Sequence, residues 1–146
     1  MKKLLSAFGF LLCVSAATAQ KLAQTAVPAP VVKTFETQFK SPAKVEWEKK
    51  TNHYEVKFEI NKINHKAKID GTGKLLRVDT DIKHTDLPAA VQKAITTQYA
   101  GYKIKDPEKF DEGGKITYKV ELKKDGAEDQ KVHFNPDGTV AKKKAD

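Results

Sequence analysis

The stretch VPAPVVKTFETQF, from Val27 to Phe39, is repeated with substitutions as LPAAVQKAITTQY, from Leu87 to Tyr99. In both stretches a Val-Pro or Leu-Pro pair is followed by apolar residues at helical spacing. Proline is tolerated in a first helical turn because the amide that it lacks would have no intrahelical partner there. The repetition therefore predicts two amphipathic helices, over residues 30–40 and 87–100.

After each helix the apolar pattern changes to a period of two, which is typical of half-buried strands. Turn residues separate four such segments in each copy, for example at Asn61-Lys62 and at Gly113-Gly114. The segments are AKVEWEKK, HYEVKFEI, INHKAKI and KLLRVDT in the first copy, and YKIKDPEKF, KITYKVELKK, QKVHF and TVAKK in the second. Each copy is thus predicted to form one helix followed by four antiparallel strands.

One helix and four short strands bury too little apolar surface to be stable alone, whereas two copies can share a core. We therefore predict an α+β fold in which two tandem repeats, residues 27–82 and 86–144, form a single domain over residues 27–146. One continuous antiparallel sheet would carry both helices on one face. The expected buried residues of the shared core are Phe35, Phe39, Trp47, Val56, Phe58, Ile95, Tyr99, Val120, Leu122 and Phe134.

The ordered set of motifs also carries a family resemblance. Beside the two proline-led helices, it contains the strands VEWE (residues 45–48) and YEV (54–56) and a closing turn of the Asp/Asn-x-x/Asp-Gly form. Over residues 27–144 this set resembles the β-lactamase-inhibitor-like, PepSY-like proteins exported by Bacteroidetes-type bacteria. The resemblance implies tandem helix-plus-four-strand units in an extended, curved antiparallel sheet. It also implies protein or peptide binding in the cell envelope, and we transfer no functional residue from the family.

Residues 1–19 have the form of a secretory signal peptide, in which Lys2 and Lys3 precede an apolar run and Ala17-Thr18-Ala19 matches a signal-peptidase site. The run is shorter than the roughly 20 apolar residues of a membrane-spanning helix. We therefore predict cleavage near Ala19 and a periplasmic or secreted protein, with no membrane span in the mature chain. Residues 20–26 are expected to form a short polar leader.

The charge balance bears on the kind of partner. The chain carries a formal net charge of +8, with 27 Lys and Arg residues against 19 Asp and Glu residues. Arg77 is the single arginine, and arginine supplies the bidentate fork that nucleic-acid recognition usually exploits. Most lysines alternate with acids along the strand-like segments, as on an ordinary solvated sheet face. We therefore predict no nucleic-acid partner.

Few residues are candidates for nucleophilic catalysis. Cys13 lies in the predicted signal peptide, and Ser41, the one serine after it, precedes Pro42 at a helix end where a turn role is expected. A serine or cysteine hydrolase is therefore excluded, while a threonine or lysine nucleophile stays open.

No metal or cofactor is predicted. The four histidines lack the paired spacing of zinc ligands, and His65 shares parity with apolar neighbours, so we expect it to be a partly buried structural residue. Asp79-Thr80-Asp81 could suggest calcium, but no EF-hand loop is present and the end of a strand explains the pair.

The favoured function is a non-catalytic, exported module that binds a protein or peptide through the open sheet face, with an envelope protease or other hydrolase as one such target. A small periplasmic enzyme that uses a carboxylate pair or a threonine, and a purely structural envelope protein, remain alternatives. The oligomeric state stays open. On the open face we expect charged residues of the parity opposite to the apolar ones, acidic-leaning in the first copy and more basic in the second. These candidate partner-binding residues are Glu46, Glu48, Glu55, Lys57, Glu59, Lys119, Glu121 and Lys123.

Overall fold

The structure of the protein is a computed structural model, in which residues 20–141 are described. The predicted signal peptide, residues 1–19, and residues 142–146 lie outside this range. The described chain contains two α-helices and one eight-stranded antiparallel sheet, so the expected α+β class is confirmed.

The two helices are α1 (Ala29–Gln38) and α2 (Ala89–Gln98). Each follows a proline at the N-cap and a one-turn 3₁₀ helix, which is η1 (Gln24–Ala26) in the first half and η2 (His84–Asp86) in the second. Both end two residues earlier than predicted, because the residues at their C-caps, Phe39 and Tyr99, leave the helical conformation.

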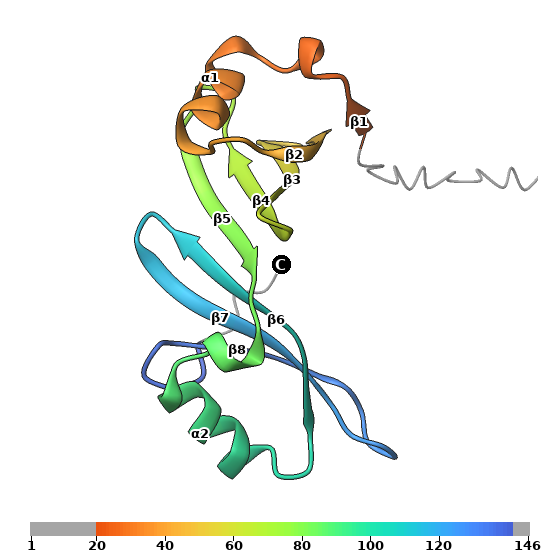
Figure 1. Ribbon diagram of the computed structural model, residues 1–146, viewed down its shortest axis with the longest axis vertical. Coiled ribbons are helices and arrows are strands. Elements are labelled where there is room, and N and C mark those ends of the chain that lie inside the picture. The colour runs from red at the N-terminus through yellow and green to blue at the C-terminus, as the bar shows by residue number, and fades with distance from the viewer. Residues whose placement is uncertain (1–19, 142–146) are drawn as a thin grey trace, which may run out of the picture.

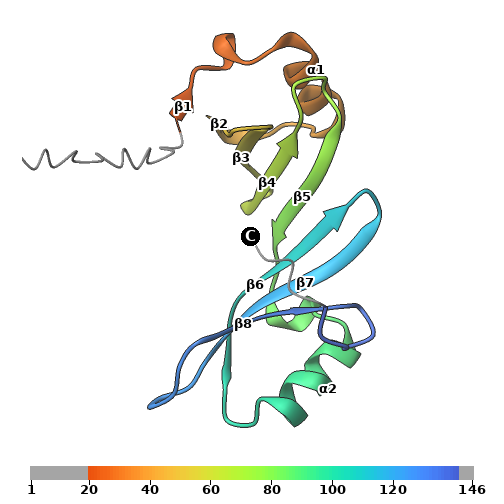
Figure 2. The ribbon, with the colours of Figure 1, turned by 180° about the vertical axis from the view of Figure 1, so that it is seen from behind.

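All eight strands pair with their neighbours in chain order, so the sheet is a simple meander. Figures 1 and 2 show an elongated molecule with α1 near one end, α2 near the other and the strands between them. The strands are β1 (Gln20–Leu22), β2 (Ala43–Lys49), β3 (Tyr54–Ile60), β4 (Ile63–Ile69), β5 (Leu75–Asp81), β6 (Lys103–Glu112), β7 (Lys115–Lys123) and β8 (Gln130–Phe134).

Two segments differ from the prediction at the edges of the sheet. Residues 20–26, expected to be a leader, form β1 and η1, and β1 pairs with residues 47–49 of β2. The fourth strand of the second copy is represented by a single bridge between Phe134 and Val140. Thr139 and Ala141 beside it are not in a strand, and residues 142–143 of the predicted segment lie outside the described range. Residues 20–22 form a strand because the edge of β2 offers unpaired backbone N–H and C=O groups, with which an adjacent extended segment can pair.

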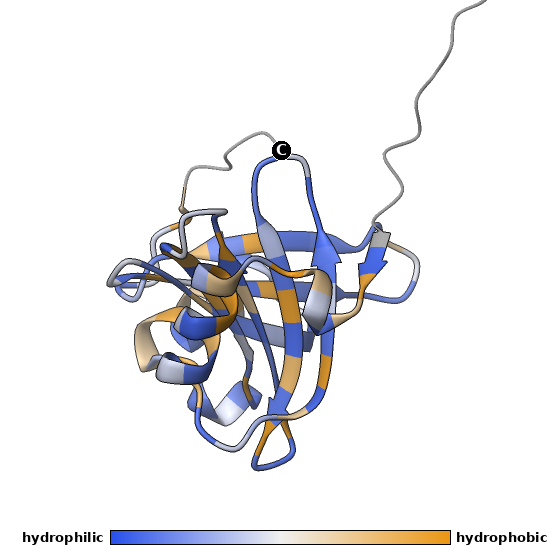
Figure 3. Ribbon diagram, turned by 90° about the horizontal axis from the view of Figure 1, so that it is seen from above, coloured by the Kyte–Doolittle hydropathy of each residue, from blue (hydrophilic) through white to orange (hydrophobic). Residues whose placement is uncertain are grey.

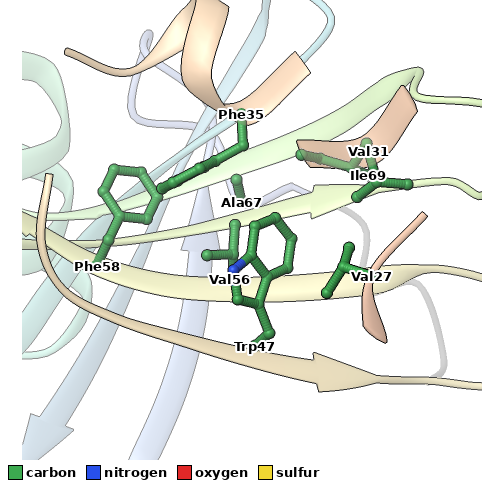
Figure 4. Packing of buried hydrophobic residues seen from close by; sticks show 8 residues of the cluster. All are labelled: Val27, Val31, Phe35, Trp47, Val56, Phe58, Ala67 and Ile69. Atoms are coloured by element: carbon green, nitrogen blue, oxygen red, sulfur yellow. The ribbon is translucent and has the colours of Figure 1, made fainter. Parts of the chain in front are cut away.

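The apolar residues form two clusters, so the prediction of one shared core is wrong. In the first cluster, shown in Figure 4, Val31 and Phe35 of α1 pack on Trp47, Val56 and Phe58 of the sheet. In the second, α2 packs on β7 and β8. The reason is geometric, because each helix has only ten residues and packs on strands of its own half. The second cluster consists of Leu87, Val91, Ala94, Ile95, Val120, Leu122, Val132 and Phe134.

The expected core residues are otherwise placed as their sequence parity indicates. Eight of them are buried, while Phe39 and Tyr99 are partly buried and pack against the first and second cluster respectively. Hydrophobic and hydrophilic residues alternate along the strands in Figure 3, as a period of two requires.

The same local geometry occurs in both halves of the chain. The β3–β4 hairpin turns through Asn61 and Lys62, and the β6–β7 hairpin through Gly113 and Gly114, with positive φ at all four residues, as in a type I′ turn. Both β2 and β6 contain a bulge beside a residue of positive φ, Lys44 and Asp106 respectively.

The closing turns of the two halves share one hydrogen-bond pattern despite their different sequences. In the first, Gly73 N donates to Asp70 O at 3.0 Å, and in the second Gly138 N donates to Asn135 O at 2.9 Å. Each glycine lies against the start of a helix, since a Cβ at Gly73 would stand 2.7 Å from the carbonyl oxygen of Pro30. These contacts fix the position of each helix on the sheet.

Candidate binding face

The strand residues that alternate with the buried ones carry most of the charge, and we call the surface that they form the open face. Residue pairs run across it from strand to strand, from Glu48 to Glu55 and on to Lys68 and Arg77. It continues into the second half through β5 and β6, where Asp79 lies opposite Phe110. Its charged and aromatic residues are Lys21, Glu46, Glu48, Glu55, Lys57, Glu59, Lys66, Lys68, Arg77, Asp79, Asp81, Lys103, Lys105, Glu108, Phe110, Glu112, Lys115, Lys119, Glu121, Lys123, Lys131 and His133.

Glu48 is held between two lysines. Its residue exposure is only 8 %, and its carboxylate oxygens lie 2.8 Å from Lys50 Nζ and 2.8 Å from Lys57 Nζ. The hydrogen bonds from Lys50 and Lys57 outweigh burial and lower the pKa of Glu48 to about 2. This carboxylate is therefore ionised throughout the physiological pH range.

Glu55, directly opposite Glu48, is also enclosed by basic side chains. Lys68 Nζ lies 3.4 Å and Lys50 Nζ 3.6 Å from its carboxylate, and its residue exposure is 9 %. Burial by itself would raise the pKa of Glu55, but a hydrogen bond from His53 and the surrounding lysine charges lower it. Lys50, which contacts both carboxylates, offsets the repulsion between the two opposed glutamates.

A third buried carboxylate, Asp79, lies at the centre of the sheet and is 3 % exposed. Arg77 Nη2 donates to Asp79 Oδ2 at 2.8 Å, Arg77 Nε donates to Oδ1, and Lys66 Nζ lies 2.9 Å from Oδ2. Burial would lower the pKa of the Arg77 guanidinium, but its bonds to Asp79 raise it. The guanidinium carbon also lies 4.3 Å above the ring centre of Phe110, which it shields from solvent.

The expected exposure of the candidate residues is therefore wrong for Glu48 and Glu55. Parity places them on the open face correctly, but lysines of the neighbouring strands cover them. The acidic lean expected for the first copy is reduced accordingly, because the ammonium groups stand outermost. The remaining candidates are ion-paired nearer the surface, in the pairs Glu46–Lys21, Glu59–Lys44, Lys119–Glu108 and Lys123–Glu121.

Sequence reasoning missed Lys66, Lys68, Arg77 and Phe110 as members of this face, and it assigned Asp79 to the end of a strand. The available signal was the alternation of Arg77 and Asp79 around Val78, which gives both residues one parity in β5. Their pairing with β6 could not be found in this way, because it depends on which strands become neighbours.

A groove of about 300 Å³ opens where β3, β4 and β5 meet β6. Its charged walls are lysines from the first half and carboxylates from β3, β5 and β6. His65 stacks on Phe58 beside it, with ring centres 5.3 Å apart, and its Nδ1 lies 3.1 Å from Thr80 Oγ1. Burial lowers the pKa of His65, so the prediction of a partly buried structural histidine is confirmed. The groove is lined by Lys44, Lys57, Phe58, Glu59, Asn64, His65, Lys66, Asp79, Asp81 and Glu108.

Two residues considered above for catalysis or metal binding, Ser41 and Asp79, lie in a turn and in an ion-pair network respectively. Ser41 follows α1 with a φ of 52°, in the turn before β2. Asp79 of the Asp-Thr-Asp segment is engaged by Arg77 and Lys66. Within residues 20–141, no group of three or more His, Asp or Glu side chains is arranged to hold a metal ion. No helix in that range has the length and apolar character needed to cross a bilayer.

Solved structures with the same fold come from several Bacteroides species. A DUF2874 family protein from Bacteroides uniformis superposes with a TM-score of 0.72 at 20 % identity, covering 77 % of this chain and 85 % of that one. A periplasmic protein, so described, from Bacteroides eggerthii gives 0.73 at 16 % identity, with coverages of 78 % and 85 %. A BLIP-like protein from Bacteroides fragilis gives 0.69 at 16 % identity, with coverages of 80 % and 85 %. No curated protein matches the chain.

The family itself is established by sequence. The family described as "Putative beta-lactamase-inhibitor-like, PepSY-like" matches twice, over residues 15–77 and 62–142. The two matches overlap and together include every described helix and strand. The resemblance inferred from the helix and strand motifs is thereby confirmed, and the chain belongs to the β-lactamase-inhibitor-like, PepSY-like family.

Proposed function

We propose that this protein is an exported, non-catalytic binding module that contacts a protein or peptide through the open face. The observation that carries the proposal is the ordered charge network of that face, in which Glu48, Glu55 and Asp79 are almost buried yet held by cations. Fixed charges of both signs orient a partner and exclude wrong ones at little entropic cost. A surface that served only solubility would need no such fixed arrangement.

The open face is free for a partner if both helices lie on the opposite side of one sheet made of two tandem repeats. The pairing register supports this arrangement. Ala67, in the α1 cluster, lies opposite Val78, which lies opposite Asp111, which lies opposite Ile116. Ile116 has the parity of Val120 and Leu122 in the α2 cluster.

Export and the class of partner are proposed from the relatives. One relative of the same fold is described as periplasmic and another as BLIP-like, and residues 1–19 have the form of a signal peptide. An envelope protease or other hydrolase is therefore the class of partner that we test first.

The protonation states favour binding over acid–base catalysis. A glycosidase needs one carboxylic acid with a raised pKa as its proton donor. Glu48 and Glu55, opposed on adjacent strands, instead have lowered pKa values and donate no proton near neutral pH.

Site-specific photocrosslinking in the native envelope tests this proposal. We would place a photoreactive phenylalanine at Glu46 or Lys123 on the open face, and at Lys33 or Lys93 on the exposed sides of α1 and α2 as matched controls. Adducts from the open-face positions, absent from the helix positions, are expected. Adducts only from Lys33 or Lys93 would place the partner on the helices and contradict the proposal.

A further inference from the structure

One carboxylate of the open face differs from all others. Within residues 20–141, every other open-face carboxylate lies within 4.0 Å of a basic side chain, whereas Asp81 has no such partner. Asp81 is exposed, and its Oδ2 accepts a hydrogen bond of 2.9 Å from the neutral amide of Asn64. Among the open-face carboxylates of residues 20–141, Asp81 is thus the one without a cationic partner within 4.0 Å.

The position of Asp81 increases that imbalance. It lies directly opposite Glu108 in the β5–β6 ladder, and like charges at such positions destabilise a sheet. Glu108 is paired on its other side with Lys119 of β7, which leaves Asp81 without that lysine. The fold thus places two carboxylates opposite each other in the β5–β6 ladder that joins its two halves.

Both carboxylates line the groove described above. Its three lysines are already engaged, since Lys44 binds Glu59, Lys57 binds Glu48, and Lys66 binds Asp79. Three of its four carboxylates are engaged as well, by Lys44, Lys66 and Lys119, so Asp81 is the charged group of the groove left for a ligand. A volume of about 300 Å³ is at the small end of ligand-binding pockets, and suits one long side chain better than a whole small-molecule cofactor.

We infer that this groove receives a lysine or arginine side chain of the bound peptide, with Asp81 and Glu108 as its acceptors. The inference rests on the proposed function and names a specificity determinant within it. A cation beside the two opposed carboxylates offsets their repulsion, whereas a neutral side chain does not, and this difference favours basic side chains.

The test is a titration of the exported protein, labelled with ¹⁵N, with a blocked peptide of small neutral residues around one lysine. The matched peptide carries norleucine, which keeps the apolar stem and removes the charge. We expect the lysine peptide to shift the amide signals of Asn64, Asp81 and Glu108. Asp81→Asn should weaken that binding about tenfold, because a hydrogen bond to a charged group is lost. Glu36→Gln, an exposed carboxylate of α1 outside the open face, should leave it unchanged.

Folding does not confound this comparison. Asp81→Asn removes a like-charge opposition, so its free energy of unfolding should equal or exceed that of the wild type. A weaker peptide affinity in a variant of undiminished stability therefore reports on the groove.

The failure modes are distinguishable. Equal affinity of wild type and Asp81→Asn for the lysine peptide, or equal binding of the norleucine peptide, would overturn the groove assignment. If the shifts then lay elsewhere on the open face, for example at Lys119 and Lys123, the proposed function would stand without it. Shifts confined to α1 and α2 would overturn both.

Discussion

The enclosed carboxylate of Glu48 makes the stability of the protein depend on acid pH in a defined window. Its pKa falls from 4.5 to about 2 on folding because Lys50 and Lys57 donate hydrogen bonds to the ionised form. A folded-state pKa below the unfolded value contributes stability above pH 4.5, and that contribution is lost as the pH falls from 4.5 toward 2. Replacing Glu48 by glutamine keeps the shape and removes the charge.

The magnitude follows from the pKa difference. About 2.5 pKa units correspond to about 3 kcal/mol, since one unit is 1.36 kcal/mol. The side chain of Lys57 is 51 % exposed, so solvent screens this partner and reduces the contribution. We therefore expect Glu48→Gln to lower the free energy of unfolding by about 1–3 kcal/mol at pH 7.

Urea unfolding of wild type and Glu48→Gln, measured from pH 7 down to pH 2.5, tests this. The difference between the two proteins should stay constant above about pH 5 and shrink steadily below it. Glu46→Gln is the matched control, because Glu46 is 54 % exposed and its single contact, with Lys21, is 3.5 Å long. Its effect should stay within about 0.5 kcal/mol. A Glu48→Gln deficit of the same size at pH 7 and pH 2.5 would refute the electrostatic account, since it would not depend on the charge.

Three further predictions concern the fold and the N-terminus. Gly73 and Gly114 have φ values of 92° and 93°, but only a Cβ at Gly73 would meet the start of a helix. Gly114→Ala should therefore lower the free energy of unfolding by about 1–2 kcal/mol, and Gly73→Ala by about 1–3 kcal/mol more. Equal losses of stability in thermal unfolding would show that the turn does not position α1. Phe134→Ala should lower the free energy of unfolding by about 3–5 kcal/mol and destabilise the α2 half first. Amide hydrogen exchange should then stay slow at Val56, in the other cluster, whereas faster exchange throughout the chain would indicate one cooperative core. Intact mass of the exported protein should correspond to a chain that begins at Gln20, and retention of residues 1–19 would contradict the signal-peptide prediction.

The helices, the hairpin order and most buried residues could be predicted from local pattern. Apolar spacing of 3.6 identified α1 and α2 because a short helix must turn one face to the sheet, and the change to a period of two identified the strands. Asn61-Lys62 and Gly113-Gly114 indicated tight turns because their preferred conformations close a two-residue hairpin. These features depend on neighbours in the chain, and the sequence specifies those directly.

The candidate face could be predicted only in part. Parity assigned Glu48 and Glu55 to the correct side, because successive side chains of any strand point to opposite faces. Their burial could not be predicted, since it depends on Lys50, Lys57 and Lys68 reaching across from other positions and strands. Charge in the sequence is a property of each residue, whereas exposure is a property of its cross-strand neighbours.

The sequence by itself therefore determined the family and the antiparallel sheet with its two helices, because periodicity and turn chemistry are local. Only the tertiary structure decided that the core divides into two clusters, because each short helix reaches no further than its own half of the sheet. It also decided that Asp81 meets Glu108 at the joint between the halves. That meeting depends on the register of β5 against β6, which joins residues so far apart along the chain that no local pattern spans them.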